Sequence, residues 1–334
     1  MKHNYVEMIR DANVYDVARK TPLDFASLLS QRLNNQIWLK REDMQSVFSY
    51  KIRGAYNLMS SLTAAELAAG VVAASAGNHA QGVALSARKL RTKAIIVMPK
   101  TTPSIKIDAV FRLGGEVVLH GNSYDDASEY AKSLASERAL TFIPPYDHPL
   151  VIAGQGTVGL EILEQANSEI DAIFVPVGGG GLVSGIGAYI KEVSPTIKLI
   201  GVEPAEAASM TAALDSGKRV SLEEIGIFAD GAAVRQVGKE NFLLAQRHVD
   251  EMLTVTIDEI CAAVKDIFED TRSIAEPAGA LSLAGVKQYI SKYQIKEKHF
   301  VSILSGANVN FDRLRHIAEL AELGEEREVL IGAT

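Results

Sequence analysis

Short apolar runs recur along this chain, and each is followed by a turn of small residues and then by a stretch with helical spacing. In the clearest two cases, residues 71–74 lead into 75–82, and residues 172–177 lead into 178–181. Strand, loop and helix in this order build parallel sheets, so the pattern predicts an α/β fold. The 334 residues, 47% of them hydrophobic, can bury sizeable cores. We expect parallel strands at 71–74, 94–98, 116–119, 172–177, 199–203 and 300–304.

Two of the turns have the composition of anion-binding loops. Residues 178–181 are four consecutive glycines, whose backbone amides can approach phosphate oxygens at the start of a helix. The nucleotide spacing G-x-G-x-x-G does not fit, because its last small position would fall on Val183 or Ser184. The alternative is a linker or a close crossing of helix and strand. Residues 75–82 also suit an anion, or else a plain tight turn with Asn78 as a cap.

Lys51 is expected to lie in the first turn of a helix. Ser49 is interpreted as the N-cap, and Ile52, Ala55, Tyr56 and Met59 follow at helical spacing. The positive end of the helix dipole and partial burial both disfavour an ammonium group, so they lower the pKa of this lysine. A neutral amine is what Schiff-base chemistry with a carbonyl compound or pyridoxal phosphate requires. The alternative is an ordinary solvated lysine at a helix start.

The apolar run 301–304 ends at Ser305. Its hydroxyl is placed either to reach a heterocycle nitrogen or to cap a neighbouring amide.

Seven short motifs follow one another along the chain: residues 21–23 (TPL), 40–43 (KRED), 49–51 (SYK), 75–79 (SAGNH), 178–182 (GGGGL), 276–280 (EPAGA) and 305–308 (SGAN). In this order they resemble the pyridoxal-phosphate-dependent enzymes of the tryptophan-synthase-β type, and threonine dehydratases in particular. The resemblance covers nearly the whole chain, and residues 152–157 (IAGQGT) and 322–328 (ELGEERE) are similar to the biosynthetic form.

The resemblance implies a role for each matching residue. Lys51 would bind pyridoxal 5'-phosphate as a Schiff base and then take the substrate Cα proton, while Asn78 would bind the phenolic oxygen. Tyr50 and the Gly231 backbone would lie on opposite ring faces, and Ser305 would face the ring nitrogen. The phosphate would be bound by Gly178, Gly179, Gly180, Gly181 and Leu182. The substrate carboxylate would lie at the loop formed by Ser75, Ala76, Gly77, Asn78 and His79.

The same resemblance implies two open-sheet α/β domains of pyridoxal-phosphate fold type II, with the cofactor in the cleft between them. A small domain, residues 41–145, would be inserted in a large domain made of 1–40 and 146–334. The enzyme would be a homo-oligomer, either a dimer or a tetramer. Biosynthetic relatives carry a regulatory domain after the catalytic one, and this chain stops at Thr334, so we expect activity without inhibition by isoleucine.

The implied reaction is the first step of isoleucine biosynthesis, deamination of L-threonine to 2-oxobutanoate and ammonia by α,β-elimination of water, with L-serine giving pyruvate. A neutral Ser305 at the ring nitrogen makes the cofactor a weaker electron sink than an aspartate would, which suits elimination. The alternatives are a serine racemase or serine dehydratase, another β-replacement enzyme of this fold, and a cofactor-free metabolite-binding scaffold. Ala76 stands where racemases of this fold carry a proton-donating serine, so racemisation is not expected.

Charge and composition exclude several classes of partner. The net charge of −7 argues against nucleic acid, and no apolar stretch is long enough to span a membrane. The first residues lack a signal peptide, so a cytoplasmic location is expected. Cys261 is predicted to be a core residue in a reducing compartment. Dispersed histidines give no metal motif, and Glu203 with the Ala207 carbonyl is a weak cation candidate.

Overall fold

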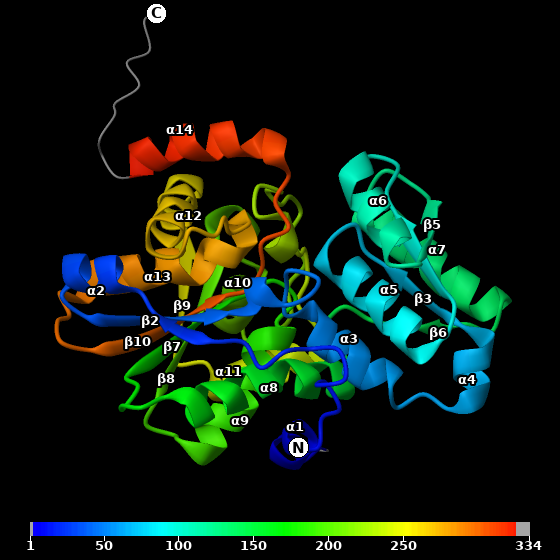
Figure 1. Ribbon diagram of the computed structural model, residues 1–334, viewed down its shortest axis with the longest axis horizontal. Helices are drawn as coiled ribbons and strands as arrows, with labels where there is room; N and C mark the ends of the chain where they lie inside the picture. Colours follow the sequence, from blue (N-terminus) through cyan, green and yellow to red (C-terminus); the bar gives the residue numbers. More distant parts are fainter. Residues whose placement is uncertain (1–2, 325–334) are drawn as a thin grey trace, which may run out of the picture.

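The computed structural model describes residues 3–324 and contains two sheets (Figure 1). The larger has six strands in the order β1-β2-β10-β7-β8-β9. All neighbours in it pair in parallel except β1 and β2, which are antiparallel. Its strands are β1 (Leu23–Phe25), β2 (Gln36–Arg41), β7 (Ala172–Pro176), β8 (Lys198–Pro204), β9 (Glu251–Val255) and β10 (His299–Leu304).

The smaller sheet is wholly parallel, with four strands in the order β5-β4-β3-β6. Together the two sheets confirm all six predicted strands, to within one residue at each end. Four strands were missed. The smaller sheet comprises β3 (Val71–Ala74), β4 (Ala94–Met98), β5 (Glu116–Leu119) and β6 (Thr141–Phe142).

Alternation along β7 divides the core of the larger sheet between its two faces. Phe174 packs on the side of α12 (Ile257–Thr271) and α13 (Pro277–Tyr293), whereas Ile173 packs toward α8 (Pro149–Gln165) and α9 (Gly181–Val193). Successive side chains of a strand point to opposite faces, so this sheet is covered on both sides. Cys261 is fully buried on the α12 side, as predicted.

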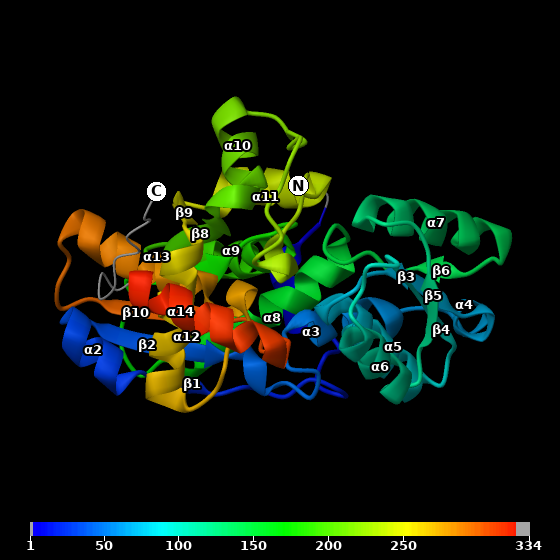
Figure 2. The same cartoon turned by 90° about the horizontal axis from the view of Figure 1, so that it is seen from above.

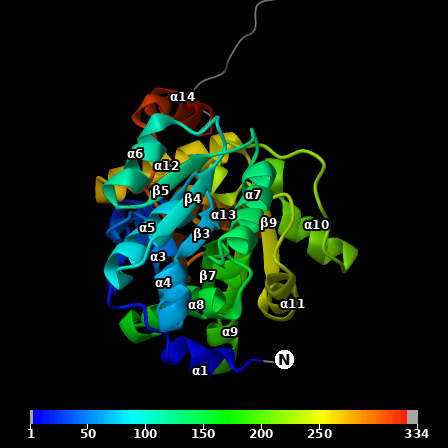
Figure 3. The ribbon, with the colours of Figure 1, turned by 90° about the vertical axis from the view of Figure 1, so that its right-hand side faces the viewer.

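The smaller sheet is also covered on both faces. Figure 3 shows it between α5 (Asn78–Leu90) and α7 (Tyr124–Glu137). Val71 and Ala73 face a core shared with α5 and α3 (Lys51–Met59), while Val72 and Ala74 face α7. The other helices are α1 (Tyr5–Arg10), α2 (Ser27–Leu33), α4 (Ala64–Ala69), α6 (Ser104–Arg112), α10 (Ser209–Ser216), α11 (Lys239–His248) and α14 (Leu314–Gly324). Short 3-10 turns are η1 (Glu42–Met44), η2 (Ala205–Ala207), η3 (Asp230–Ala232) and η4 (Phe311–Arg313).

Helices α3 and α8 pack together where the two sheets meet (Figure 2). Four charged side chains with no solvent exposure join them: Arg53 pairs with Glu42 at 2.8 Å and with Glu161 at 2.6 Å, and Lys40 pairs with Glu161 at 2.6 Å. Burial without partners would be costly for each charge, so two cations and two anions compensate one another. This cluster fixes the helix that begins at Lys51.

Within residues 3–324, none of the helices has the length and apolar character needed to cross a membrane. The predicted motif at 322–328 falls partly beyond this range, because residues 325–328 lie outside the described part of the chain.

Candidate functional site

Helix α3 begins at Lys51, so the predicted position of this lysine in a first helical turn is confirmed. The interpretation of Ser49 as N-cap is wrong: Tyr50 occupies that position, and no side chain caps the helix. Ser49 instead forms a β-bridge with Gly306, and its buried hydroxyl has no hydrogen-bond partner among the described residues. The bridge holds this backbone beside the end of β10, which overrides the local preference of a serine for capping.

The Lys51 amine lies in an environment that favours its neutral form. Nζ donates a hydrogen bond to the Pro145 carbonyl at 3.1 Å. Burial lowers the pKa of Lys51 to about 8, although the nearby Glu276 carboxylate opposes that shift. Because an ordinary lysine titrates near 10.5, a far larger fraction of this amine is nucleophilic at neutral pH.

Asn78 connects the smaller sheet to the larger one. It opens α5, and its Nδ2 donates to Glu276 Oε1 at 2.6 Å, while Asn308 Nδ2 donates to Asn78 Oδ1 at 2.7 Å. Nδ2 carries two hydrogens, so one remains for a ligand after the bond to Glu276 is made. The structure therefore fixes the orientation of this amide from both of its ends.

The loop before α5 presents unpaired donors. Gly77 is the N-cap and provides no side-chain bond, so the first amides of a 13-residue helix are available to an anion. Ser75 Oγ accepts from Gly77 N at 3.2 Å, which leaves its own proton free to donate.

The ring of His79 is engaged elsewhere, with Nε2 placed 2.9 Å from the Ile143 carbonyl. Burial lowers the pKa of His79 to about 3, so the ring is neutral. Only the His79 backbone amide is free for a carboxylate.

The glycine loop follows β7 and leads directly into α9. Gly180 has a φ of 93°, a conformation that residues with a side chain rarely adopt, and it is an N-cap without a side-chain bond. The first backbone bond of α9 runs from Ser184 N to Gly180 O at 3.0 Å, so the preceding amides have no helical acceptor. Gly179 lies against the Tyr146 ring, where an added Cβ would come within 2.2 Å of a ring carbon.

Separate segments bring these residues to one place. Pro145 accepts from Lys51, and the next residue, Tyr146, packs on the glycine loop. On the other side, a Cβ on Gly178 would lie 2.9 Å from Ala232 Cα, and one on the adjacent Gly231 would lie 3.7 Å from Asn78 Nδ2. An aldehyde bound to the amine and an anion at the loop are therefore compatible with one ligand.

Ser305 joins this group through its backbone, because its carbonyl accepts from Tyr50 N at 3.2 Å. Its hydroxyl is buried and lies 3.4 Å from the Ala278 carbonyl, at the long limit of a hydrogen bond. The hydroxyl is thus held only weakly within the chain. Its role toward a ring nitrogen stays a prediction.

Glu276 is a site residue that sequence reasoning missed. It appeared only within the motif 276–280, yet the residue is 4% exposed and its carboxylate accepts from Asn78. A Cβ added to Gly231 would lie 3.6 Å from its Oε1. Burial, followed by the negative charge of Asp230, raises the pKa of Glu276 to about 7. Nothing local indicates this role, because the contact with Asn78 spans 198 residues.

The raised pKa of Glu276 predicts a pH-dependent stability that glutamine removes. Between about pH 4.5 and 7 the folded protein binds this proton more tightly than the unfolded chain, so stability falls as the pH rises through that window. In the cofactor-free protein, urea unfolding at pH 5 and pH 7 should show a fall that is smaller in Glu276→Gln by on the order of 2 kcal/mol. An identical pH dependence in both proteins would exclude a titrating Glu276.

Glu203, the cation candidate, is occupied by protein donors. Its carboxylate accepts from Met210 N at 2.7 Å and from Thr211 N at 2.9 Å, so it caps the start of α10. Burial raises its pKa to about 7. Ala207 lies nearby in η2, and no group of three metal-ligating side chains occurs within residues 3–324.

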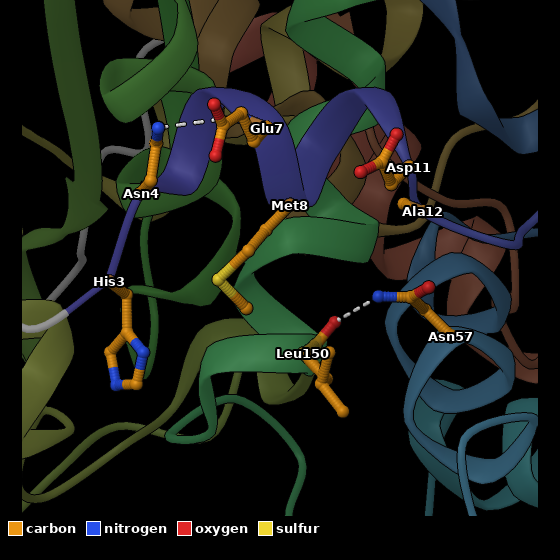
Figure 4. A pocket seen from close by; sticks show the side chains of 8 residues that line it. All are labelled: His3, Asn4, Glu7, Met8, Asp11, Ala12, Asn57 and Leu150. Carbon is orange, nitrogen blue, oxygen red and sulfur yellow. Dashed lines mark hydrogen bonds between the residues drawn. The ribbon is translucent and has the colours of Figure 1, made fainter.

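A surface hollow of about 420 Å³ lies beside α1 (Figure 4), and Lys51 is not among the residues that line it. Asn57, in its wall, donates to the Leu150 carbonyl at 2.7 Å and accepts from Asn13 N at 2.8 Å, so both ends of its amide have a partner in the chain. The hollow contains none of the predicted site residues.

Comparisons with known proteins identify the family to which the chain belongs. The chain matches a family model described as pyridoxal-phosphate dependent enzyme over residues 14–306. It is 54% identical over 330 residues to the biosynthetic L-threonine dehydratase of Pasteurella multocida, and the aligned region covers 99% of this chain and 64% of that protein. It is 56% identical over 327 residues to the chloroplastic biosynthetic threonine dehydratase of Arabidopsis thaliana, and the aligned region covers 98% of this chain and 55% of that protein.

A solved structure, the processed form of threonine deaminase isoform 2 from Solanum lycopersicum, matches with a TM-score of 0.93 at 50% identity. The match covers 95% of this chain and 92% of that one. The chain spans less than two thirds of the length of the two curated dehydratases.

Proposed function

This chain belongs to the family of pyridoxal-phosphate-dependent enzymes, and on that premise we propose that it deaminates L-threonine to 2-oxobutanoate and ammonia by α,β-elimination of water. L-Serine would give pyruvate by the same route. The observation that supports this most is the meeting of Lys51 with the glycine loop at the adjacent residues Pro145 and Tyr146. Sequence identity of 54% and 56% to two threonine dehydratases, over nearly the whole chain, favours a dehydratase within this family.

The residues present fit the family's cofactor. The uncapped start of α9 supplies backbone donors for a phosphate, and Lys51 supplies an amine with a lowered pKa for an aldehyde. Asn78 keeps one amide hydrogen for a phenolic oxygen, and Ser305 has a hydroxyl bound only weakly elsewhere. When bound, pyridoxal phosphate supplies an electron sink for the charge that develops at the substrate Cα.

The chain's own groups bind the substrate and move its proton. The free amides at the start of α5 and the Ser75 hydroxyl would hold the substrate carboxylate. Lys51, as a neutral amine, would take the Cα proton. Departure of the β-hydroxyl as that proton leaves avoids a long-lived carbanion, which suits the neutral Ser305.

A serine racemase of this fold is the second candidate, and Ala76 argues against it. Racemisation needs a proton donor on the face of Cα opposite the lysine, and the methyl group of Ala76 has no proton to give. We expect only trace D-serine from L-serine. Chiral chromatography that detects rapid formation of D-serine would contradict this assignment.

The oligomeric state, the cellular location, the domain division and a bound cation are further parts of this proposal. The enzyme would act as a homo-oligomer, a dimer or a tetramer, in the cytoplasm, where a reduced Cys261 is the ordinary state. Residues 41–145 would form a small domain inserted in a large one made of 1–40 and 146–334. A cation at Glu203 would compete with the hydrogen bonds that Met210 N, Thr211 N and Thr211 Oγ1 donate to its carboxylate.

A coupled assay of the two oxo acids tests the proposed reaction. With L-threonine, the holoenzyme should release equal amounts of 2-oxobutanoate and ammonia. With L-serine, it should release pyruvate at a different rate. The two substrates differ by one methyl group, so their kcat/KM values should differ by no more than about 200-fold. Release of neither oxo acid by a chain that has bound pyridoxal phosphate would refute the dehydratase assignment and favour a β-replacement enzyme.

A further inference from the structure

The carbonyl of Gly179 is held from behind by two donors at the start of α11. Gly238 N donates to it at 3.1 Å, and Asn241 Nδ2 donates at 2.8 Å. In a planar trans peptide, the carbonyl oxygen and the following amide hydrogen point in opposite directions. Fixing the Gly179 oxygen toward α11 therefore turns the Gly180 N–H away from α11, the orientation that an amide needs to meet a ligand in front of the loop.

The start of α11 is itself held in place. The Asp147 carboxylate accepts from Lys239 N at 2.8 Å and from Glu240 N at 3.0 Å, which satisfies two free amides of the helix. Ser184 Oγ donates to the Asn241 carbonyl at 3.1 Å, so α11 is tied to α9 as well. Asn241 thus has a fixed backbone from which to hold the glycine loop.

The side chain of Asn241 is better suited to donating than to packing. It is fully buried, and its Oδ1 has no hydrogen-bond partner among the described residues. An unpaired buried amide oxygen lowers stability, and a leucine of similar size would avoid that loss. The amide cannot be reversed, since an oxygen facing the Gly179 carbonyl would place two acceptors together. What the asparagine adds is its hydrogen bond to Gly179.

We propose that Asn241 is a positioning residue for the glycine loop, which sets the Gly179–Gly180 peptide so that the Gly180 amide can bind the cofactor phosphate. This rests on the proposed function, because the loop must hold a phosphate group. Asn241 acts through the loop and does not itself contact the ligand.

Two ligands that differ only in the phosphate separate this role from a general effect on folding. The cofactor-free protein is titrated with pyridoxal phosphate and with pyridoxal, and the dissociation constants are read from absorbance. Asn241→Leu removes the donor at similar size, and Asn241→Ala removes it by truncation; neither substitution adds a charge or a new donor. Each substitution should raise the dissociation constant of pyridoxal phosphate about tenfold, because one hydrogen bond is lost, and should leave the dissociation constant of pyridoxal unchanged. The ³¹P resonance of the bound cofactor should also shift in both variants.

Asn35→Leu is the matched control. Asn35 is equally a buried asparagine, whose Nδ2 donates to the carbonyls of Leu33 and Ile295, but it precedes β2 at the opposite end of the larger sheet. It should leave both dissociation constants unchanged. If one Asn241 variant does not fold, the other still carries the comparison.

The outcomes separate the inference from the proposed function. Suppose that wild type binds pyridoxal phosphate more tightly than pyridoxal. An Asn241 variant that weakens the binding of both ligands equally, or of neither, then overturns the positioning role and leaves the proposed function standing. A wild-type protein without that preference overturns the proposed function, and the role of Asn241 with it.

Discussion

Replacing Lys51 with alanine should lower the turnover of L-threonine by about 10²- to 10⁴-fold, the range expected when a general base is removed. Lys51 is the amine whose pKa burial lowers to about 8, and it donates to the Pro145 carbonyl. Without it, no neutral amine takes the substrate proton. Steady-state release of 2-oxobutanoate measures the loss.

The pH profile distinguishes this role from a structural one. In wild type, the reaction of cofactor-free protein with pyridoxal phosphate should accelerate as the pH rises through about 8, because only the neutral Lys51 amine attacks. Lys20→Ala is the control, since Lys20 is an exposed lysine paired with Glu164 on the surface. Normal turnover in Lys51→Ala would contradict the assignment of the base.

Replacing Arg53 with alanine should cost about 3–5 kcal/mol of folding free energy, the usual result of removing one partner from a buried ion pair. Arg53 is unexposed and donates to both Glu42 and Glu161, so the substitution leaves two buried carboxylates short of a cation. The pKa of Glu42 is lowered by Arg53, against the opposing effect of burial. Urea unfolding of the cofactor-free protein measures the change.

The exposed pair Arg315 and Glu319 is the control for Arg53. The Arg315 side chain is 89% exposed, and its loss to alanine should change the unfolding free energy by less than about 0.5 kcal/mol. Because the buried cluster joins α3 to α8, folded Arg53→Ala should also bind pyridoxal phosphate more weakly. An unfolding free energy equal to wild type would show that the cluster does not hold these helices together.

The strands that the sequence predicts are those whose signal is local. The runs at 71–74 and 172–177 are apolar throughout and buried on both faces, as helix-covered parallel strands must be. Strand β2 was missed because it ends in two buried charges, Lys40, which pairs with Glu161, and Arg41, which pairs with Asp43 and Asp24. Glu161 neutralises Lys40 from 121 residues away, and no periodicity reveals such a pair.

The site divides in the same way. Lys51 and the glycine loop carry local signals, a lysine at a helix start and four glycines between strand and helix. Glu276 and Asn241 carry none, because each acquires its role from one long-range hydrogen bond, to Asn78 and to Gly179. The cap assigned to Ser49 failed for the converse reason, since a tertiary bridge to Gly306 outweighed a local preference.

The central claim is that Lys51 binds an aldehyde cofactor whose phosphate lies at the glycine loop. The direct measurement is borohydride reduction of the protein loaded with pyridoxal phosphate, followed by peptide mass mapping. We predict that an absorbance band near about 410–420 nm disappears and that one reduced pyridoxyl-phosphate group is found on Lys51. A group on another lysine, or none at all, would contradict the account.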